Sequence, residues 1–353
     1  MVLVARPLLR LGLLAVGSLL AAGCKPTLDD SSTLVSSPRV LAVRATPAEA
    51  SPGDDVTLSA LYVDASGVRT EGALDWALCT ARKPLTELGP VSPSCLVAAA
   101  DWLIPLGTGL AASATLPKEA CRDFGPDTPA TKAGEPPGRS VDPDRTGGYY
   151  QPVRLMLPEG VPPPFVATEI RLVCGLPGAS QEDLALYQRR RRINENPALA
   201  LIEASIDGVT QSVPDAGAVT VRPGARIELT ASWADCPTVP ACGDGVCSAD
   251  EDAMQCARDC MAPKGCPGSE QFGSFDPTTR TNVLRREQIR LSWFATAGAF
   301  DAPHTGRSAD EPTPANSSNG FTAPDTSGKV TVWIVVRDDR GGVGWRSFAV
   351  IVS

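Results

Sequence analysis

The chain contains a single histidine in 353 residues, and this scarcity excludes several kinds of site. A metal centre built from several histidines is excluded, and a Ser-His-Asp triad would have to use His304. That residue lies in a polar, proline-rich stretch (302–325), which we expect to be a loop that leaves it solvated. A glycine-rich phosphate loop, a serine on a nucleophile elbow and a credible Cys–His pair are also lacking. We therefore expect that the chain is not an enzyme.

Positive charge is the second shortage, because 32 Lys and Arg residues stand against 40 Asp and Glu residues, for a net charge of −8. An acidic balance argues against nucleic acid or an anionic lipid as the main partner. Proline and glycine are abundant by comparison, with 33 and 32 residues. That share indicates many turns between short strands, although it stays below the level of a disordered composition.

The first apolar run of the chain is short. Arg6 and Arg10 precede an uncharged, Leu-rich run (11–20), and small residues follow at 21–23. A helix that crosses a bilayer needs about 20 apolar residues. A basic head, a short apolar middle and a small-residue cut site are typical of a secretory signal. We therefore expect residues 1–23 to be a signal peptide and the mature protein to be exported.

Cys24 follows the small residues, and here the sequence resembles the lipobox of bacterial lipoproteins. The resemblance implies a cut before Cys24 and acyl chains such as palmitate on its sulfur, which would hold the protein at a membrane. Lipidation would leave ten of the eleven cysteines, an even set that can pair fully. Lys25 stands where the family's inner-membrane retention signal is Asp, which implies the outer membrane of a Gram-negative cell envelope. Because Ala21 occupies the usual Leu position, a plain secretory cut is the alternative.

The length of the mature chain predicts two domains at about 100–200 residues each. We place a lipidated, flexible tether at 24–37, a first domain at 38–178, a helical linker at 179–197 and a second domain at 198–353. Ser180 and Asp183 are typical of a helix N-terminus in the linker, and Pro197 marks its end. The four arginines at 189–192 could suggest a phosphate patch, but we favour a solvated helix end.

An internal echo links the two domains. The segment 52–64 is Pro-Gly followed by a strand that alternates with period two, and the same pattern returns at 223–235, an offset of 171 residues. This unit resembles the second strand of bacterial Ig-like and PKD-type β-sandwiches, and 328–352 is similar to the final hairpin of a PKD domain. The resemblance implies a mainly β fold: two Ig-like/PKD-like antiparallel β-sandwich domains with a disulfide-rich insertion and one short helix.

The first domain carries ten prolines between about 80 and 150, and we interpret this stretch as an insertion between strands, stapled by disulfides. Its four cysteines, Cys79, Cys95, Cys121 and Cys174, allow three pairings. We favour Cys79–Cys95, which closes a short loop, and Cys121–Cys174, which ties the insertion to a strand.

The second domain holds a cysteine-rich insertion at 236–266, similar to short Cys-Gly-Asp-Gly-x-Cys repeats of exported bacterial proteins. It contains Cys236, Cys242, Cys247, Cys256, Cys260 and Cys266. Three disulfides are favoured, since so small a unit lacks a core of its own. A zinc site is a second interpretation, although the spacing of the cysteines lacks paired Cys-x-x-Cys knuckles. Structural Ca²⁺ is a third, additional to the disulfides, because carboxylates in a turn-rich stretch suit that ion. The calcium candidates are Asp244, Asp250, Glu251, Asp252 and Asp259.

Taken together, the sequence favours a membrane-anchored envelope lipoprotein that acts as a non-catalytic interaction or structural module. It would bind an unknown envelope protein or a glycan through loops that the sandwiches present, and it would need no cofactor. The alternative is a cell-envelope hydrolase, or an accessory subunit of an envelope enzyme, with a pair of carboxylates. Forty acidic residues make some pair inevitable, so the discriminating feature is a cleft with two converging carboxylates of raised pKa.

Overall fold

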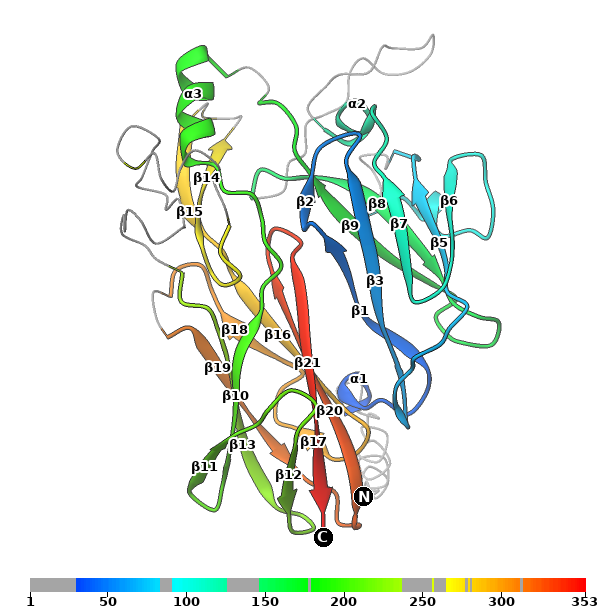
Figure 1. Cartoon of the computed structure of the whole chain (residues 1–353), viewed down its shortest axis with the longest axis vertical. Helices are drawn as coiled ribbons and strands as arrows, with labels where there is room; N and C mark the ends of the chain where they lie inside the picture. The colour runs from blue at the N-terminus through cyan, green and yellow to red at the C-terminus, as the bar shows by residue number, and fades with distance from the viewer. Residues whose placement is uncertain are drawn as a thin grey trace, which may run out of the picture.

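The structure is a computed structural model that describes residues 30–82, 91–125, 146–176, 179–236, 256, 265–276, 279, 281–311 and 314–353. The leader, Cys24 and the first part of the tether lie outside these residues. The last part of the predicted tether is not flexible. Helix α1 (Asp30–Thr33) is followed by Leu34, which bridges to Ala295, and by Val35, which is fully buried. The apolar pair Leu34-Val35 therefore belongs to the folded body (Figure 1).

The first sandwich consists of two mainly antiparallel sheets that enclose one apolar core. One sheet has the order β1-β3-β4, with β7 also paired to β3. Its strands are β1 (Arg39–Thr46), β3 (Asp55–Asp64), β4 (Gly67–Val68) and β7 (Ala111–Thr115). The other sheet has the order β2-β9-β8-β5-β6. Its strands are β2 (Glu49–Ala50), β5 (Asp75–Cys79), β6 (Leu103–Thr108), β8 (Tyr149–Met156) and β9 (Phe165–Leu172). Two short helical turns, η1 (Pro93–Cys95) and α2 (Ala120–Phe124), lie between strands.

The second sandwich repeats this plan with two five-stranded sheets. The sheet β11-β10-β13-β19-β17 is built from β10 (Leu199–Ile206), β11 (Val209–Ser212), β13 (Arg226–Trp233), β17 (Ala299–Phe300) and β19 (Asn316–Thr322). The sheet β12-β21-β20-β16-β18 is built from β12 (Ala218–Val221), β16 (Ile289–Ala295), β18 (His304–Arg307), β20 (Gly328–Asp338) and β21 (Val343–Val352). The mainly β fold with two Ig-like sandwiches is thus confirmed.

The echo in the sequence corresponds to equivalent strands. β3 and β13 both follow a glycine of positive φ, Gly53 or Gly224, and both pair with the strand that opens their sandwich. Each opening strand carries a bulge at the same place, opposite Tyr62 in the first sandwich and opposite Trp233 in the second. The short strand that directly precedes β3 or β13, namely β2 or β12, belongs to the other sheet and pairs in parallel with the last strand of its sandwich.

One tryptophan fills the centre of each core. Trp76 on β5 and Trp293 on β16 are both fully buried. The indole N–H of Trp76 donates to the carbonyl of Gly109 at 2.8 Å, and that of Trp293 donates to Thr305 Oγ1 at 2.9 Å. Each ring therefore buries its apolar body while its polar atom keeps a partner, as buried indoles generally do.

The predicted insertion at about 80–150 is corrected by two strands. β6 and β7 lie inside it, yet each belongs to one sheet of the sandwich, so the stretch is not a single insertion. Proline hid β6, because Pro105 lacks the N–H of a regular strand; the structure tolerates it at the sheet edge, where no further strand is paired. The predicted loop at 302–325 is corrected in the same way, since β18 and β19 lie within it.

The two sandwiches are stacked, so that the chain forms four layers of sheet. β1 and β3 turn their outer face toward the outer face of β20 and β21, and a third apolar cluster fills the boundary (Figure 1). Its buried members are Val35, Leu41, Ala42, Leu61, Val63, Trp333, Val335 and Val343. The bulge in β1 contributes to this contact, because it places the consecutive residues Leu41 and Ala42 on the same outer face.

A separate hairpin and one helix lie beside the first sandwich. The hairpin is β14 (Gln271–Asp276) paired with β15 (Thr281–Arg286), and it directly precedes β16. Helix α3 (Gln181–Arg190) packs against this hairpin, and its N-terminus is closed by the predicted capping box of Ser180 and Asp183. The hairpin reaches the first sandwich through Ser274 Oγ, which donates to the carbonyl of Thr146 at 3.3 Å. Among the described residues, no helix is long and apolar enough to cross a membrane.

Candidate functional site

The structure pairs Cys79 with Cys95 and Cys121 with Cys174, the two pairings favoured from the sequence. It also pairs Cys236 with Cys266, which closes the cysteine-rich segment at its base, and Cys256 is disulfide-bonded too. The other predicted site residues lie outside the described residues. They are Cys24, Cys242, Cys247 and Cys260, together with the calcium candidates Asp244, Asp250, Glu251, Asp252 and Asp259. Within the described part of the chain, no group of three side chains could hold a metal ion.

A buried cluster of charges lies where the hairpin, the linker and the β20–β21 turn meet. Its centre is Arg340, which is 1 % exposed. Nε of Arg340 donates to Glu287 at 2.6 Å, one Nη donates to Glu270, and the other donates to the carbonyl of Arg192 at 2.8 Å. The guanidinium also lies 4.3 Å from the ring centroid of Phe272. A single side chain from the last hairpin of the chain thus joins β14, β16 and the linker.

Glu270 and Glu287 converge on Arg340, and both are almost fully buried. Burial raises the pKa of Glu270 to about 7, although Arg340 acts in the opposite direction. Burial also raises the pKa of Glu287 well above its ordinary range. For Arg340, burial alone would lower the pKa, but Glu287 and Glu270 outweigh it and raise the pKa. Burial therefore favours the protonated form of Glu270 far more than it would at an exposed carboxyl.

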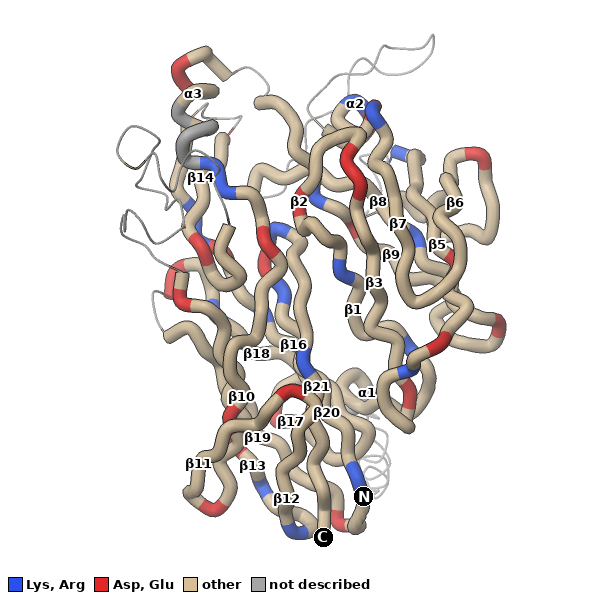
Figure 2. The backbone as a smooth tube through the Cα atoms, in the orientation of Figure 1, with Lys and Arg blue, Asp and Glu red and all other residues tan. Residues whose placement is uncertain are grey.

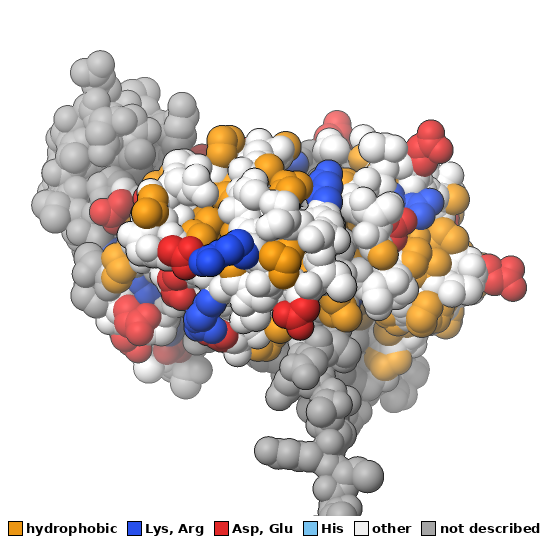
Figure 3. All heavy atoms as spheres, turned by 90° about the horizontal axis from the view of Figure 1, so that it is seen from below, with side chains coloured by type: hydrophobic (Ala, Val, Ile, Leu, Met, Phe, Trp, Pro, Cys, Tyr) orange, Lys and Arg blue, Asp and Glu red, His pale blue; other side chains and the backbone are white. Residues whose placement is uncertain are grey.

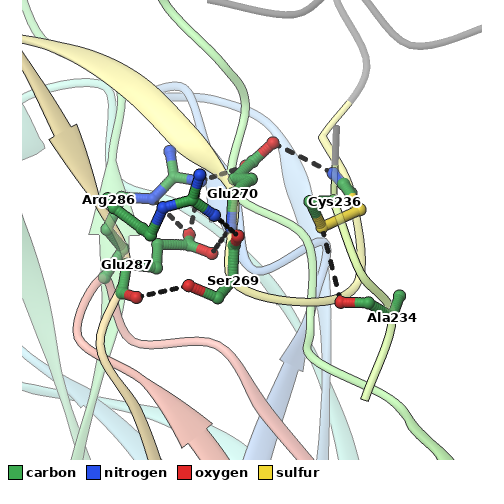
Figure 4. Close-up of a disulfide and its surroundings, with 8 residues drawn as sticks. Ala234, Cys236, Ser269, Glu270, Arg286 and Glu287 are labelled. Carbon is green, nitrogen blue, oxygen red and sulfur yellow. Dashed lines mark hydrogen bonds and ion pairs between the residues drawn. A yellow bond between two sulfur atoms is a disulfide. The ribbon is translucent and has the colours of Figure 1, made fainter. Parts of the chain in front are cut away.

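The disulfide Cys236–Cys266 sets the position of Glu270. The backbone N–H of Cys266 donates to the second carboxylate oxygen of Glu270 at 3.1 Å, and the backbone N–H of Glu270 donates to Glu287 at 3.1 Å. Figure 4 shows the disulfide directly beside Glu270, with Ser269 and Arg286 closing the other side. The base of the cysteine-rich segment and the buried charges thus form one connected structure.

A second branch of the cluster reaches the first sandwich through Glu49 on β2. Its carboxylate lies 3.0 Å from Arg191 and 3.8 Å from Arg171, and it accepts the backbone N–H of Asn194 at 2.9 Å. Burial would raise the pKa of Glu49, but Arg171 and Arg191 outweigh it, and the pKa is lowered. Glu49 is therefore ionised and holds the linker against the first sandwich.

The expected solvated helix end at 189–192 is wrong for its last two residues. Helix α3 ends at Arg190, Arg191 is extended, and Arg192 is 2 % exposed. Arg191 pairs with Glu49, and the carbonyl of Arg192 accepts from Arg340. Sequence patterning gave no signal for this, because a run of arginines after a helix is usually solvated. The turn out of the helix, which brings both residues inward, depends on partners far away in the chain.

The converging carboxylates do not form a hydrolase site. A carboxylate pair that cleaves a glycosidic bond must flank its substrate in an open cleft. Glu270 is 3 % exposed and Glu287 is 1 % exposed, and both are held by Arg340. Raised pKa values are found in structural ion networks as well as in active sites. The arrangement therefore joins elements, and no side chain in it has access to a substrate.

The single histidine also lies beside a serine. Ser292 Oγ is 3.2 Å from His304 Nδ1, on neighbouring strands β16 and β18. The serine is 3 % exposed, and its other polar neighbour is Arg337, whose Nη1 donates to Oγ at 3.3 Å. A triad needs a carboxylate to orient the imidazole and an exposed hydroxyl to attack. Among the described residues, no carboxylate is paired with His304, and the hydroxyl of Ser292 is buried, so the pair does not have the arrangement of a triad.

An exposed tryptophan, Trp102, lies in the loop that precedes β6. We call residues 91–102 the braced loop. The ring is 41 % exposed, and its N–H donates to the carbonyl of Ser94 at 2.9 Å. The carbonyl of Trp102 accepts from the N–H of Thr80 at 2.8 Å and from its hydroxyl at 3.0 Å. The disulfide Cys79–Cys95 closes the loop, and Leu96 and Ile104 are also exposed nearby in sequence. The indole is thus fixed in place while 41 % of the residue remains exposed.

Charge is not concentrated on the end of the molecule seen in Figure 3. Basic, acidic and apolar side chains are interspersed over that face. A nucleic-acid platform requires a continuous basic stripe. The visible face of the second sandwich therefore offers no such platform.

No protein-family profile matches the chain, and no curated protein matches it. Among solved structures, it is similar to the fibronectin(III)-like modules of Clostridium thermocellum CbhA, with 8 % identity over 88 % of this chain and 94 % of that chain and a TM-score of 0.19. The D00-D0 domain of intimin gives 9 % identity over 90 % and 98 %, with a TM-score of 0.21. The Yersinia pseudotuberculosis adhesin InvE gives 10 % identity over 88 % and 58 %, with a TM-score of 0.20. Likenesses this weak establish nothing about the function of this chain.

Proposed function

We propose that this chain is a non-catalytic interaction module of the cell envelope that binds a protein or glycan through the braced loop around Trp102. The observation that carries the proposal is an exposed indole whose position is fixed by three hydrogen bonds and a disulfide. An exposed aromatic side chain usually costs conformational entropy when it is immobilised by a partner. Here Trp102 is already immobilised in the folded protein, so less conformational entropy would be lost when a partner binds it.

The rest of the loop supports the same role. Nη1 of Arg154, on β8, donates to the carbonyls of Val97 and Ala98, both at 3.0 Å, and Arg154 also pairs with Asp75. A rigid sheet therefore holds both sides of the loop. Tryptophan is enriched among the residues that contribute most to binding at interfaces. Binding residues also lie preferentially on loops that a rigid scaffold positions.

Replacement of Trp102 tests the proposed binding surface. We expect Trp102→Ala to weaken capture of envelope glycans or proteins about tenfold or more, which corresponds to about 1.4–3 kcal/mol for an interface aromatic. The measurement is a glycan array together with crosslinking of the full chain to isolated envelopes. Val209→Ala is the matched control, because Val209 is 71 % exposed on the second sandwich. Equal capture by both variants would rule out the surface.

We propose that a lipid on Cys24 holds this module at the membrane, most simply at the outer membrane of a Gram-negative envelope. The leader and the even number of remaining cysteines support it. Expression with a tagged palmitate should label the parent chain and should not label Cys24→Ser, which is expected to move to the soluble fraction. Labelling that survives the substitution would contradict a lipid at this position, and the binding surface would be unaffected by that result.

A further inference from the structure

The outer face of the sheet β12-β21-β20-β16-β18 carries two arginines directly opposite one another. Arg290 on β16 pairs with Arg337 on β20 in the register of the sheet. Residues that face each other across an antiparallel pair lie about 4.5–5.5 Å apart at Cβ, and like charges in that position are destabilising. Arg290 is exposed, whereas Arg337 is only partly exposed. A negative charge held between the two guanidinium groups would relieve this repulsion.

The adjacent row of the same face adds two polar side chains. Ser292 pairs with His304 in the register of β16 and β18, two residues along from Arg290. Ser292 Oγ accepts from Arg337 at 3.3 Å and lies 3.2 Å from His304 Nδ1. Arg337 also donates to the carbonyl of Leu41, on the first sandwich, at 2.8 Å. Serine therefore holds Arg337 and His304 together at the edge of the boundary between the sandwiches.

No carboxylate of the described residues neutralises these charges. Neither Arg290 nor Arg337 forms an ion pair with any residue in the described ranges. Burial, followed by the charge of Arg290, lowers the pKa of Arg337 to about 10. Burial, followed by Arg290 and Arg337, also lowers the pKa of His304.

Two more arginines line the same boundary from β1. Arg39 lies 5.9 Å from the ring centroid of Phe294, and Arg44 lies 4.7 Å from that of Trp345. The Nε atom of each is buried without a hydrogen-bond partner among the described residues. Figure 2 shows basic positions on the strands at both sides of this boundary. In a chain with an acidic balance overall, this is a local excess of positive charge.

We propose that Arg290, Arg337 and His304 form a binding site for a phosphate group. The two guanidinium groups supply planar sets of N–H donors that match the oxygens of such an anion, and bidentate contacts of this kind are among the strongest hydrogen bonds in proteins. A tetrahedral oxyanion offers enough oxygens to accept from both arginines and from the imidazole at once. Bound phosphate would remove the repulsion between the paired arginines. Ser292 acts as a positioning residue.

The proposal is tested by titrating the full chain with sodium phosphate at pH 7.5, with sodium chloride matched for ionic strength. We expect saturable heat in calorimetry with a Kd of about 1 mM. Phosphate should also raise the melting temperature above that in chloride. Arg290→Gln should weaken phosphate binding at least tenfold. Arg222→Gln, which removes an exposed arginine elsewhere, should bind phosphate as the parent does.

The stability of the unliganded variants gives a second readout. Arg290→Gln removes one of two opposed like charges, so its melting temperature without phosphate should exceed that of the parent. Arg290→Glu should be more stable still and should not bind phosphate, since its carboxylate would pair with Arg337. Two results would overturn the site: no phosphate binding by the parent at 20 times the expected Kd, or equal binding by the parent and Arg290→Gln. Unchanged or lower stability in both variants would overturn the repulsion argument on which the site rests.

Two further binding experiments distinguish a lipid headgroup from a soluble ligand as the source of the phosphate group. Binding to phosphatidylglycerol vesicles that requires Arg290 and is competed by inorganic phosphate would place it on a lipid headgroup. Binding of inorganic phosphate without vesicle binding would place it on a soluble ligand. Both results support the site. Acetate that binds as tightly as phosphate would overturn the assignment to phosphate in favour of a carboxylate. None of these outcomes depends on Trp102, so they are separable from the proposed interaction surface.

Discussion

The carboxylates around Arg340 show how burial and partners set the charge of individual residues. Glu49 and Glu270 are both buried, yet the pKa of the first is lowered and that of the second is raised. The difference lies in their neighbours. Arg171 and Arg191 lie close to Glu49, whereas Glu270 shares Arg340 with Glu287. Two carboxylates around one guanidinium cannot both be neutralised by it, and desolvation then favours a proton.

The sign of this effect predicts how stability depends on pH. The pKa of Glu270 is raised from 4.5 to about 7 on folding, so its stabilising contribution is fully present below pH 4.5 and is lost as pH rises through 7. We expect the free energy of unfolding to fall by on the order of 3 kcal/mol between pH 5 and pH 8, because one pKa unit corresponds to about 1.4 kcal/mol. Urea denaturation at each pH measures it. Glu49 acts with the opposite sign, because its lowered pKa removes stability at acid pH.

Glu270→Gln is the variant that assigns the slope. The amide cannot ionise, so we expect a flatter profile between pH 5 and pH 8, while Glu228→Gln on the exposed face of β13 should keep the parent profile. An unchanged slope in Glu270→Gln would show that another group controls stability in this range.

At the scale of elements, the strands with clean alternation could be predicted and the others could not. The pattern in 52–64 and 223–235 predicted β3 and β13, because one face of each is buried and period two follows directly. β6 was hidden by Pro105, and β19 by its run of Asn and Ser. The hairpin β14–β15 has a buried first strand with Gly and Ser in it, so composition gave no strand signal.

The buried charge cluster could not be predicted from the sequence either. Arg340, Glu270 and Glu287 are separated by up to 70 residues, and charged residues are almost always on the surface unless paired. They come together only because the tertiary fold places the β20–β21 turn beside the hairpin. The favoured disulfides of the first domain could be predicted from the sequence, because four cysteines allow only three pairings. One of these combines a short loop, Cys79–Cys95, with a link from the predicted insertion to a strand, Cys121–Cys174.

The disulfide Cys236–Cys266 should control the order of the hairpin. It closes a loop with a sequence separation of 30, for which chain entropy gives about 3.5 kcal/mol, and its Cys266 N–H holds Glu270. We expect the double variant Cys236→Ser, Cys266→Ser to lose amide protection in β14 and β15, measured by hydrogen exchange. The matched control is Cys79→Ser, Cys95→Ser, with a separation of 16 in the first sandwich. If this control lowers protection in β14 equally, the link through Glu270 is refuted.

At the scale of the whole molecule, the stacking of the sandwiches distinguishes two otherwise equivalent units. The bulge of β1 turns Ala42 into the boundary, where it is 3 % exposed. The equivalent bulge of β10 turns Leu201 to the outside, where it is 36 % exposed. The same bulge thus places a residue in the contact between the sandwiches in the first sandwich, but exposes the equivalent residue to solvent in the second.

This equivalence supplies a matched pair of variants. Ala42→Asp adds bulk at a tightly packed position, where Ala42 is 3 % exposed, and takes a carboxylate out of water, so it should cost about 3–5 kcal/mol of the association of the sandwiches. Leu201→Asp, at the equivalent place, should change stability by about 0.5 kcal/mol or less. Scanning calorimetry should show one transition for the parent and Leu201→Asp and two for Ala42→Asp. A single unchanged transition in Ala42→Asp would mean that the boundary contributes little.

The parallel strand pairs give the molecule a mechanical direction. β2 runs beside β9 over two residue pairs, and β12 runs beside β21 over four, from Ala218–Ala349 to Val221–Val352. In each sandwich, an early strand and the last strand point the same way, so tension between the chain ends slides them past each other. A ladder under shear must break all its hydrogen bonds together, whereas one that is peeled breaks them singly. We therefore expect the second sandwich, which has the longer parallel ladder, to withstand more force than the first before its strands separate.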